Sequence, residues 1–288
     1  MLASEILCSA PNTITAMLGQ RSEAAAAYNR FAPFYDEFNA QNDYEVWLGQ
    51  VLLPELEKHG LLNAINDAGE QRVLDIGCGT GRAIPPLAAR GWQVDGCDIS
   101  PRMLEMAAAK YPLMNADSFR VADARDLPSY QREASAPRLF QLILALNDVV
   151  NYLTQDGDLK RAFEGMKRNL APHGLICFDA NTFGLFATGF LAGGCMERGE
   201  FSWRGLTEEL IEGGTFIAEL GGPGLEHHVH RQRHWLSEEV NDALEATGLR
   251  TLALLGQSED APGTVPVLRE PLDEQRDYKA IYIVGHHG

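Results

Sequence analysis

Short runs of apolar residues recur through the middle of the chain, separated by longer stretches in which apolar residues return at helical spacing. Runs of this kind are typical of strands that are buried on both faces of a parallel sheet. We expect five strands before residue 183, at 72–77, 93–99, 118–124, 140–146 and 174–181. Helices are expected at 81–90, 101–110 and 156–170. The alternation predicts βαβ units and an α/β fold.

The end of the chain returns to the same alternation after an irregular region. A helix is expected at 237–248, and strands at 249–256 and 279–285 bring the sheet to seven strands. Residues 183–236, rich in Gly, Phe and Trp, predict short antiparallel strands over the carboxyl edge of the sheet, where ligands of open α/β sheets bind. We therefore expect one domain, 1–288, with its core at 61–182 and 237–288 and a substrate-covering insertion at 183–236.

The first 60 residues predict a helical cap. Residues 1–22 are weakly patterned and are expected to form an arm. A helix that starts near Ser22 should be interrupted at Pro33, because proline lacks a backbone N–H. A second helix is expected at 44–59, where apolar residues recur at helical spacing.

Composition narrows the classes of partner. The 288 residues include 40 acidic and 24 basic side chains, for a formal charge of −16, which disfavours a nucleic-acid partner. The five cysteines are widely spaced without a C-x-x-C motif, so neither a disulfide framework nor a zinc site is expected. No basic segment precedes an apolar core at the N-terminus, and no apolar run is long enough to span a membrane. These patterns favour a cytoplasmic protein without a membrane partner.

The segment "VLDIGCGTG" (73–81) reads as a buried strand that enters a glycine-rich turn. A dinucleotide fingerprint is G-x-G-x-x-G, whereas Gly77, Gly79 and Gly81 give G-x-G-x-G. Asp75, just before the turn, would repel a pyrophosphate. A ligand with a cationic amino group and a carboxylate suits both Asp75 and the helix N-terminus, and the methionine part of S-adenosylmethionine carries both charges.

Two further acids lie at the ends of the next two expected strands. Asp98 ends the second strand, where a carboxylate can accept hydrogen bonds from ribose hydroxyls. Asp123 ends the third strand, where the exocyclic amine of an adenine would lie. A nicotinamide oxidoreductase remains an alternative, opposed by the loop spacing and by Asp75. The glycines could also serve only close packing at a strand–helix turn.

With "DISPRML", "VADARDLP" and "LALNDVVNYL" following in order, the chain resembles the class I S-adenosylmethionine-dependent methyltransferases. The likeness covers about 72–153 and continues more weakly to the end. It implies a Rossmann-like, mostly parallel seven-stranded sheet with helices on both faces, and S-adenosyl-L-methionine as the cofactor. The cofactor-binding residues that it implies are Tyr28, Tyr35, Asp75, Gly77, Cys78, Gly79, Asp98, Ile99, Met103, Asp123, Ala124, Leu146 and Asn147.

The N-terminal "YNRFAPFYDEF" resembles the aromatic cap of the small-molecule enzymes of this family. Tyr28, Tyr35 and Trp47 match its aromatic positions. Tyrosine hydroxyls could bind the methionine carboxylate, and the ring faces could contact the sulfonium. Trp47 is expected to serve packing instead.

The segments "FDANT" (178–182) and "HHVHRQRHW" (227–235) resemble a subset in which an antiparallel sheet covers the acceptor site. This likeness implies substrate contacts from Asn151, Asn181 and Trp203. In a strand at 227–235, three histidines would share one face, at positions His228, His230 and His234. They could form an exposed polar face, a metal site or a general base with a pKa suited to neutral pH. No metal is expected, because no carboxylate or cysteine lies at ligand spacing; His230 and His228 are the catalytic candidates.

The expected function is a methyltransferase that acts on an oxygen or a nitrogen, less readily a carbon, of a small molecule, with secondary metabolism as one setting. An amine need only be bound neutral, whereas a hydroxyl needs a base. The alternatives are a methyltransferase for RNA or protein, and a cofactor-binding enzyme such as a cyclase that transfers no methyl group. The expected partner is the small-molecule acceptor; the oligomeric state is left open, with a dimer as one option.

Overall fold

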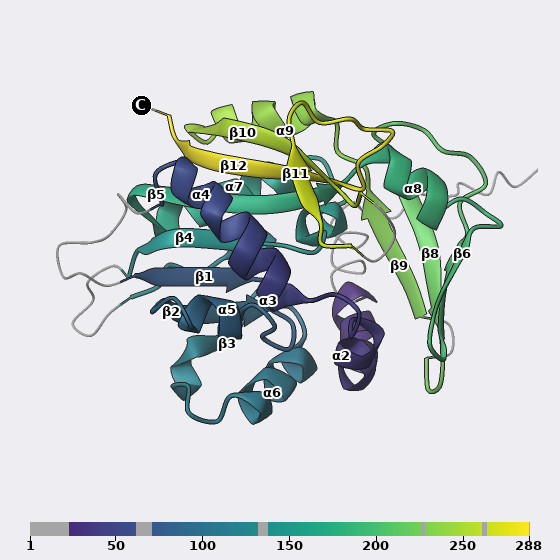
Figure 1. Ribbon diagram of the computed structural model, residues 1–288, viewed down its shortest axis with the longest axis horizontal. Helices are drawn as coiled ribbons and strands as arrows, with labels where there is room; N and C mark the ends of the chain where they lie inside the picture. Colours follow the sequence, from purple (N-terminus) through teal and green to yellow (C-terminus); the bar gives the residue numbers. More distant parts are fainter. Residues whose placement is uncertain (1–22, 62–70, 132–137, 226–227, 261–263, 288) are drawn as a thin grey trace, which may run out of the picture.

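The computed structural model describes residues 23–61, 71–131, 138–225, 228–260 and 264–287; the arm expected at 1–22 and His227 lie outside them. Its main sheet has the strand order β11-β10-β12-β5-β4-β1-β2-β3 (Figure 1). The strands are β1 (Arg72–Ile76), β2 (Gln93–Asp98), β3 (Phe119–Val121), β4 (Phe140–Ala145), β5 (Leu170–Asn181), β10 (Leu249–Ser258), β11 (Val267–Arg269) and β12 (Lys279–His286).

The sheet is Rossmann-like and mostly parallel, as the alternation predicts. Strand β1 pairs in parallel with β2 and β4, and β12 runs antiparallel between β5 and β10. The prediction of seven strands was wrong by one, because β11 adds an eighth at the edge. This strand has only three half-buried residues and pairs only with β10, so it has no apolar run to reveal it.

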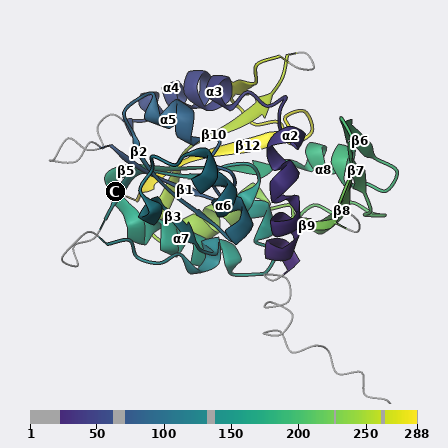
Figure 2. The same cartoon turned by 90° about the horizontal axis from the view of Figure 1, so that it is seen from below.

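Helices cover both faces of the sheet, which explains its unbroken apolar strands. On one face, Val73 of β1 shares a core with Leu52 and with Leu87 of α5 (Ile84–Ala88). On the other, Leu74 packs with α7 (Asp158–Asn169) and α9 (Ser237–Glu245). Figure 2 shows α4 and α5 on one side of the sheet and α7 on the other. Each fully buried leucine of this kind stabilises the fold by roughly 2 kcal/mol.

The N-terminal segment is helical with the interruption that Pro33 predicts. Residues 23–31 form a helix that gives way to a 3₁₀ turn at Pro33. Farther on, the helix expected at 44–59 widens to a π-helix immediately before Pro54, which cannot donate an α-helical hydrogen bond. The elements are η1 (Ala32–Phe34), α2 (Tyr35–Phe38), α3 (Tyr44–Val46), η2 (Trp47–Leu52) and α4 (Leu53–Lys58).

The short helices near the ends of the strands complete the core. Helix α6 follows β2, and Ser100 caps it by accepting from the Met103 amide at 3.1 Å. These elements are α6 (Pro101–Lys110), η4 (Ala116–Ser118), η5 (Ala124–Asp126) and η7 (Val149–Tyr152).

A second, antiparallel sheet follows β5, in the region where the sequence predicts short strands. It has the order β6-β7-β8-β9 and lies beyond the carboxyl end of β1 (Figure 1). Its elements, with the helix before them, are α8 (Phe183–Gly189), β6 (Cys195–Arg198), β7 (Phe201–Gly205), β8 (Thr215–Gly221) and β9 (His228–Arg233). Phe201 and Leu220 pack against Phe31 of the N-terminal helix, which fixes this sheet over the strand ends.

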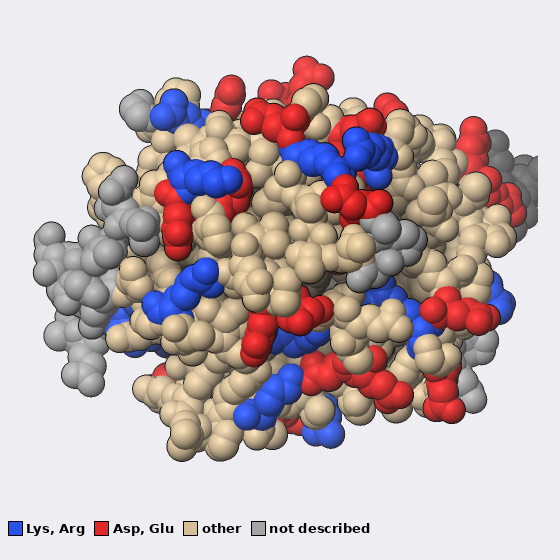
Figure 3. Space-filling view, in the orientation of Figure 1, with Lys and Arg blue, Asp and Glu red and all other residues tan. Residues whose placement is uncertain are grey.

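The surface shows no dominant charge on the face seen in Figure 3, where acidic and basic side chains are interspersed. Within the described ranges, no helix is both long enough and apolar enough to cross a membrane. Nor do those ranges bring together three or more His, Cys, Asp or Glu side chains that could hold a metal ion.

Candidate functional site

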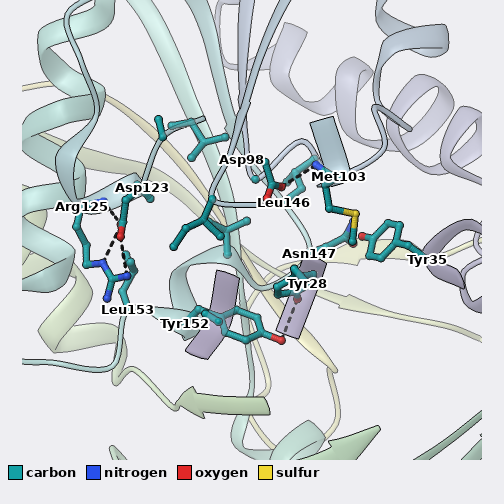
Figure 4. A pocket seen from close by; sticks show the side chains of 18 residues that line it. Tyr28, Tyr35, Asp98, Met103, Asp123, Arg125, Leu146, Asn147, Tyr152 and Leu153 are labelled. Atoms are coloured by element: carbon teal, nitrogen blue, oxygen red, sulfur yellow. Dashed lines mark hydrogen bonds and ion pairs between the residues drawn. The ribbon is translucent and has the colours of Figure 1, made fainter. Parts of the chain in front are cut away.

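A cavity opens at the carboxyl ends of β1, β2 and β4 (Figure 4). Every residue that the sequence proposes for the cofactor lines it except Asp75 and Cys78. The full lining is Ala24, Tyr28, Tyr35, Ile76, Gly77, Gly79, Asp98, Ile99, Met103, Ala122, Asp123, Ala124, Arg125, Leu146, Asn147, Val149, Tyr152 and Leu153.

The glycine turn forms the floor of this cavity. Gly77 and Gly79 have φ angles of +70° and +52°, which L side chains rarely adopt. A Cβ atom on Gly77 would lie 2.5 Å from Cγ2 of Val149. A Cβ on Gly79 would lie 3.6 Å from the Tyr35 ring, in space that the cavity uses. The turn therefore offers bare backbone to a ligand, beneath the tyrosine of the cap.

Asp98 joins this floor to the next helix. Its Oδ2 accepts from the Gly79 amide at 2.9 Å and its Oδ1 from the Ser100 amide at 2.8 Å. Burial raises the pKa of Asp98 to about 6, and the two amides oppose that rise. Each carboxylate oxygen keeps a second lone pair, so Asp98 can still accept hydrogen bonds from a pair of hydroxyls.

Asp75 and Cys78 lie behind the floor. The Asp75 carboxyl is 6% exposed and has no hydrogen bond or ion pair with any described residue. Burial, and then the charge of Asp98, raise its pKa to about 7. A buried carboxylate without a partner is costly, so this position favours a cation or a proton. The Cys78 thiol, whose pKa burial also raises, packs against Gly96 of β2.

Asp123 has a partner that the sequence did not predict. The Arg125 guanidinium binds it at both oxygens, Nε to Oδ1 at 2.8 Å and Nη2 to Oδ2 at 2.7 Å (Figure 4). The same arginine lies 3.4 Å from Asp158 of α7. The pair holds the Asp123 carboxylate in the wall of the cavity.

A second cavity of about 200 Å³ adjoins the first, beneath the antiparallel sheet. Tyr28, Tyr35, Asn147 and Tyr152 line both. Further residues of the second cavity come from both sheets, namely Asp148, Asn181, Arg198, Trp203, His230, Gln232 and Lys279. The two spaces therefore meet at the tyrosines, which suits a reaction between two ligands.

Of the three residues expected to contact substrate, Asn181 and Trp203 line the second cavity and Asn151 does not. Asn151 is fully buried; its Nδ2 donates to the Arg233 carbonyl at 2.8 Å, and its Oδ1 accepts from the Asn181 amide at 2.9 Å. Asn151 therefore ties the end of β5 to the antiparallel sheet.

The three histidines in and directly after β9 are buried, so the alternative of an exposed polar face was wrong. His228, His230 and His234 are at most 2% exposed. Burial lowers the pKa of His230 to about 3 and that of His228 to about 4. The expected pKa near neutrality was therefore also wrong, because the alternation that places the side chains on one face also takes them out of water.

His230 lines the second cavity and is hydrogen-bonded there to a tyrosine. Its Nδ1 lies 2.7 Å from the Tyr152 hydroxyl, which in turn accepts from Tyr28 at 2.9 Å (the tyrosine pair is drawn in Figure 4). The His230 Nε2 is buried without a partner among the described residues. His228 lines neither cavity and packs against Phe31. The geometry thus makes His230 a support for Tyr152.

An acid–lysine cluster at the ends of β4, β5 and β12 was missed from the sequence. The Asp179 carboxylate accepts from the backbone amides of Asn147 and Asp148, at 2.7 and 2.5 Å. These two residues have φ angles of +61° and +58°, so Asp179 stabilises a strained turn. The Lys279 Nζ lies 2.9 Å from Asp179 and 3.5 Å from Asp148.

Asp148 is the acid of this cluster that lines the second cavity, where Gln232 donates to it. Burial raises its pKa, an effect that Lys279 opposes and Asp179 reinforces. Within this cluster two carboxylates face one ammonium, so the cluster itself carries a net negative charge. The signal in the sequence was a polar residue shortly after the buried strand β4 and another near the end of β5, but whether the two meet depends on the strand order.

Asp98→Ala is expected to weaken binding of an adenosyl ligand by about 10- to 100-fold, because hydrogen bonds to an ionised group are lost and the Gly79 amide is released. Calorimetric titration with S-adenosylmethionine measures this. Asp117→Ala, at an exposed position outside the cavities, is the control. Equal affinity in wild type and Asp98→Ala would remove Asp98 from the ligand site.

Comparisons with known proteins bear on the family and the fold of the chain. Residues 73–174 match a family model described as a methyltransferase domain. YqeM of Bacillus subtilis (strain 168) is 29% identical over 157 residues, 54% of this chain and 56% of that protein. The chain therefore spans little more than half the length of this relative.

Two further likenesses cover more of the molecule. The dTDP-4-amino-2,3,4,6-tetradeoxy-D-glucose N,N-dimethyltransferase of Saccharopolyspora spinosa is 30% identical over 194 residues, 65% of this chain and 74% of that protein. A solved S-adenosylmethionine-dependent methyltransferase from Clostridium acetobutylicum ATCC 824 has a TM-score of 0.66 at 20% identity, over 91% of this chain and 99% of that one. The latter likeness concerns the fold.

Proposed function

The chain belongs to the class I S-adenosylmethionine-dependent methyltransferases, and on this premise we propose that it methylates the nitrogen of a small-molecule amine. The cofactor of this family is S-adenosyl-L-methionine, which supplies a methyl group on a positively charged sulfur. The bare glycine floor, the carboxylate of Asp98 and the unpartnered acid Asp75 fit such a ligand.

We assign the cofactor contacts accordingly. The backbone at Gly77 and Gly79 would approach the methionine part, and Asp98 would accept from the ribose hydroxyls. Asp75 would offset the positive charge of the ligand through the floor, and Asp123 would accept from the adenine amine. Tyr28 and Tyr35 would close the cavity against water, which strengthens these electrostatic interactions.

The observation that carries the choice of nitrogen is the acid–lysine cluster at the junction of the cavities. Its net negative charge would attract a protonated amine to Asp148. Because burial raises the pKa of Asp148, this carboxylate can take the proton from the ammonium and leave the lone pair free to attack.

A hydroxyl acceptor is supported less well by the same surroundings. A hydroxyl has to lose its proton during the attack, which calls for a base that titrates near neutral pH. Burial keeps His230 neutral with a pKa of about 3, and its Nδ1 is occupied by Tyr152. Burial also raises the pKa of Tyr152, which therefore stays protonated and can only orient an acceptor. The Saccharopolyspora relative, by its name, dimethylates an amino sugar, which agrees with an amine acceptor.

The test is methyl transfer from labelled S-adenosylmethionine to matched pairs of acceptors that differ only in an amine or a hydroxyl, with amino sugars and their hydroxyl counterparts first. We expect the label on the amine at least 100-fold faster, since the lone pair is available without a strong base. Preferential labelling of the hydroxyls would overturn the choice of nitrogen. Label in RNA or protein alone, or cofactor consumption without methyl transfer, would overturn the small-molecule proposal.

A further inference from the structure

A third cavity, of about 640 Å³, extends outward from the acceptor cavity. The two share Asn42, Asn147, Arg198 and Lys279. Its walls come from the N-terminal cap, from β6 and from the segments around β10 and β12. Together the two spaces are far larger than a simple amine needs and reach the size that pockets for extended small molecules have.

Arg198, the last residue of β6, stands between the two spaces. Its guanidinium lies 5.0 Å from the ring centroid of Phe38, a contact that holds it at the wall. It forms no ion pair with any described residue, and burial lowers its pKa. Glu259 lines the same cavity, and its charge opposes that lowering of the pKa. A half-buried cation that forms no ion pair with a described residue is unusual in a chain with a formal charge of −16.

Most of the other charged side chains of this cavity already form hydrogen bonds or ion pairs within the protein. Lys279 is bound to Asp179, and the Asp43 carboxylate caps α3 by accepting from the Val46 amide at 3.0 Å. Arg276 also faces the cavity and has no ion pair within the described part of the chain. Arg198 and Arg276 therefore remain available for a ligand with negative charge.

Resting on the proposed function, we propose that the acceptor carries a phosphate or diphosphate remote from its amine, and that Arg198 binds it. The planar guanidinium matches phosphate oxygens with paired hydrogen bonds. The amine would lie at Asp148, and the anion one cavity farther out. Tyr44, Trp47 and Tyr278 border the same space and offer aromatic surface to a ring attached to the phosphate. An amino-sugar nucleotide has this layout of groups.

The test measures binding without turnover, by calorimetric titration of the purified protein with thymidine 5′-diphosphate, inorganic pyrophosphate and thymidine. We expect thymidine diphosphate to bind, Arg198→Gln to weaken that binding by at least 10-fold, and Arg198→Lys to restore part of it. Binding of pyrophosphate as well as thymidine diphosphate would assign the affinity to the anion; binding of thymidine diphosphate without binding of pyrophosphate would add the aromatic wall. Both support the proposal.

The control is Arg204→Gln, an exposed arginine on the neighbouring strand β7 that lines none of the cavities, and it should bind like wild type. Unchanged S-adenosylmethionine affinity shows that the Arg198 variants are folded. The proposal fails if thymidine diphosphate does not bind, if Arg198→Gln binds it as wild type does, or if thymidine binds equally well. Failure of the amine test alone leaves these titrations unaffected, so the two proposals fail separately.

Discussion

Asp75→Asn is expected to stabilise the free protein and, at the same time, to weaken S-adenosylmethionine binding by at least 100-fold. The Asp75 carboxyl has a folded pKa of about 7 against an ordinary value of 3.8. A raised carboxyl pKa contributes stability below about pH 4 and loses it as the pH rises through 7. At pH 8 the ionised, unpartnered Asp75 therefore costs on the order of 2–4 kcal/mol, which asparagine avoids.

Urea unfolding at pH 4 and pH 8 measures the gain, which should be small at pH 4 and largest at pH 8. Asp95→Asn is the matched control, because this equally buried acid lies 3.1 Å from Arg138 and should lose stability on substitution. Wild-type affinity for S-adenosylmethionine should rise from pH 5.5 to 8 as Asp98 and Asp75 ionise, and Asp75→Asn should flatten that rise. A variant that is destabilised at pH 8, or that binds the cofactor normally, contradicts this role.

The sequence was most informative where a single element decides the outcome. Strands β1 and β4 were predictable because helices cover both of their faces, so their residues are uniformly apolar. The glycine turn was predictable because only glycine readily adopts the backbone of Gly77 and Gly79. Strand β11 was not, since its three residues owe their conformation to pairing with β10.

Contacts between elements that are distant in the sequence could not be predicted from the pattern of apolar and polar residues. The cluster of Asp148, Asp179 and Lys279 exists because β5 lies between β4 and β12, with Lys279 opposite Asn181 in the register. The alternation along β9 correctly placed His228 and His230 on one face but carried no information on whether that face meets water. The net charge of the chain likewise did not predict the charges of an individual cavity. A total of −16 does not reveal that Arg198 lines a cavity without forming an ion pair with a described residue.

Asp148→Asn is expected to cause the largest loss of turnover, at least 100-fold in kcat/KM for an amine, or about 3 kcal/mol of transition-state stabilisation. Asparagine keeps the size of the side chain and can still pair with Gln232, but it neither attracts an ammonium nor takes its proton. Because Asp148 belongs to the acceptor cavity and not to the adenosyl cavity, S-adenosylmethionine affinity should stay within about 2-fold of wild type.

Steady-state kinetics against pH separate attraction from proton removal. If Asp148 takes the proton, the defect should shrink as the pH approaches the pKa of the free amine, where the acceptor already arrives neutral. If Asp148 only positions the amine, the defect should fall mainly on KM and change little with pH. Asp156→Asn is the control, because this acid is exposed and lines none of the cavities. Its Oδ1 lies 2.7 Å from Nη1 of Arg233. Wild-type turnover in Asp148→Asn would remove Asp148 from the chemistry and would overturn the argument for a nitrogen acceptor that rests on it.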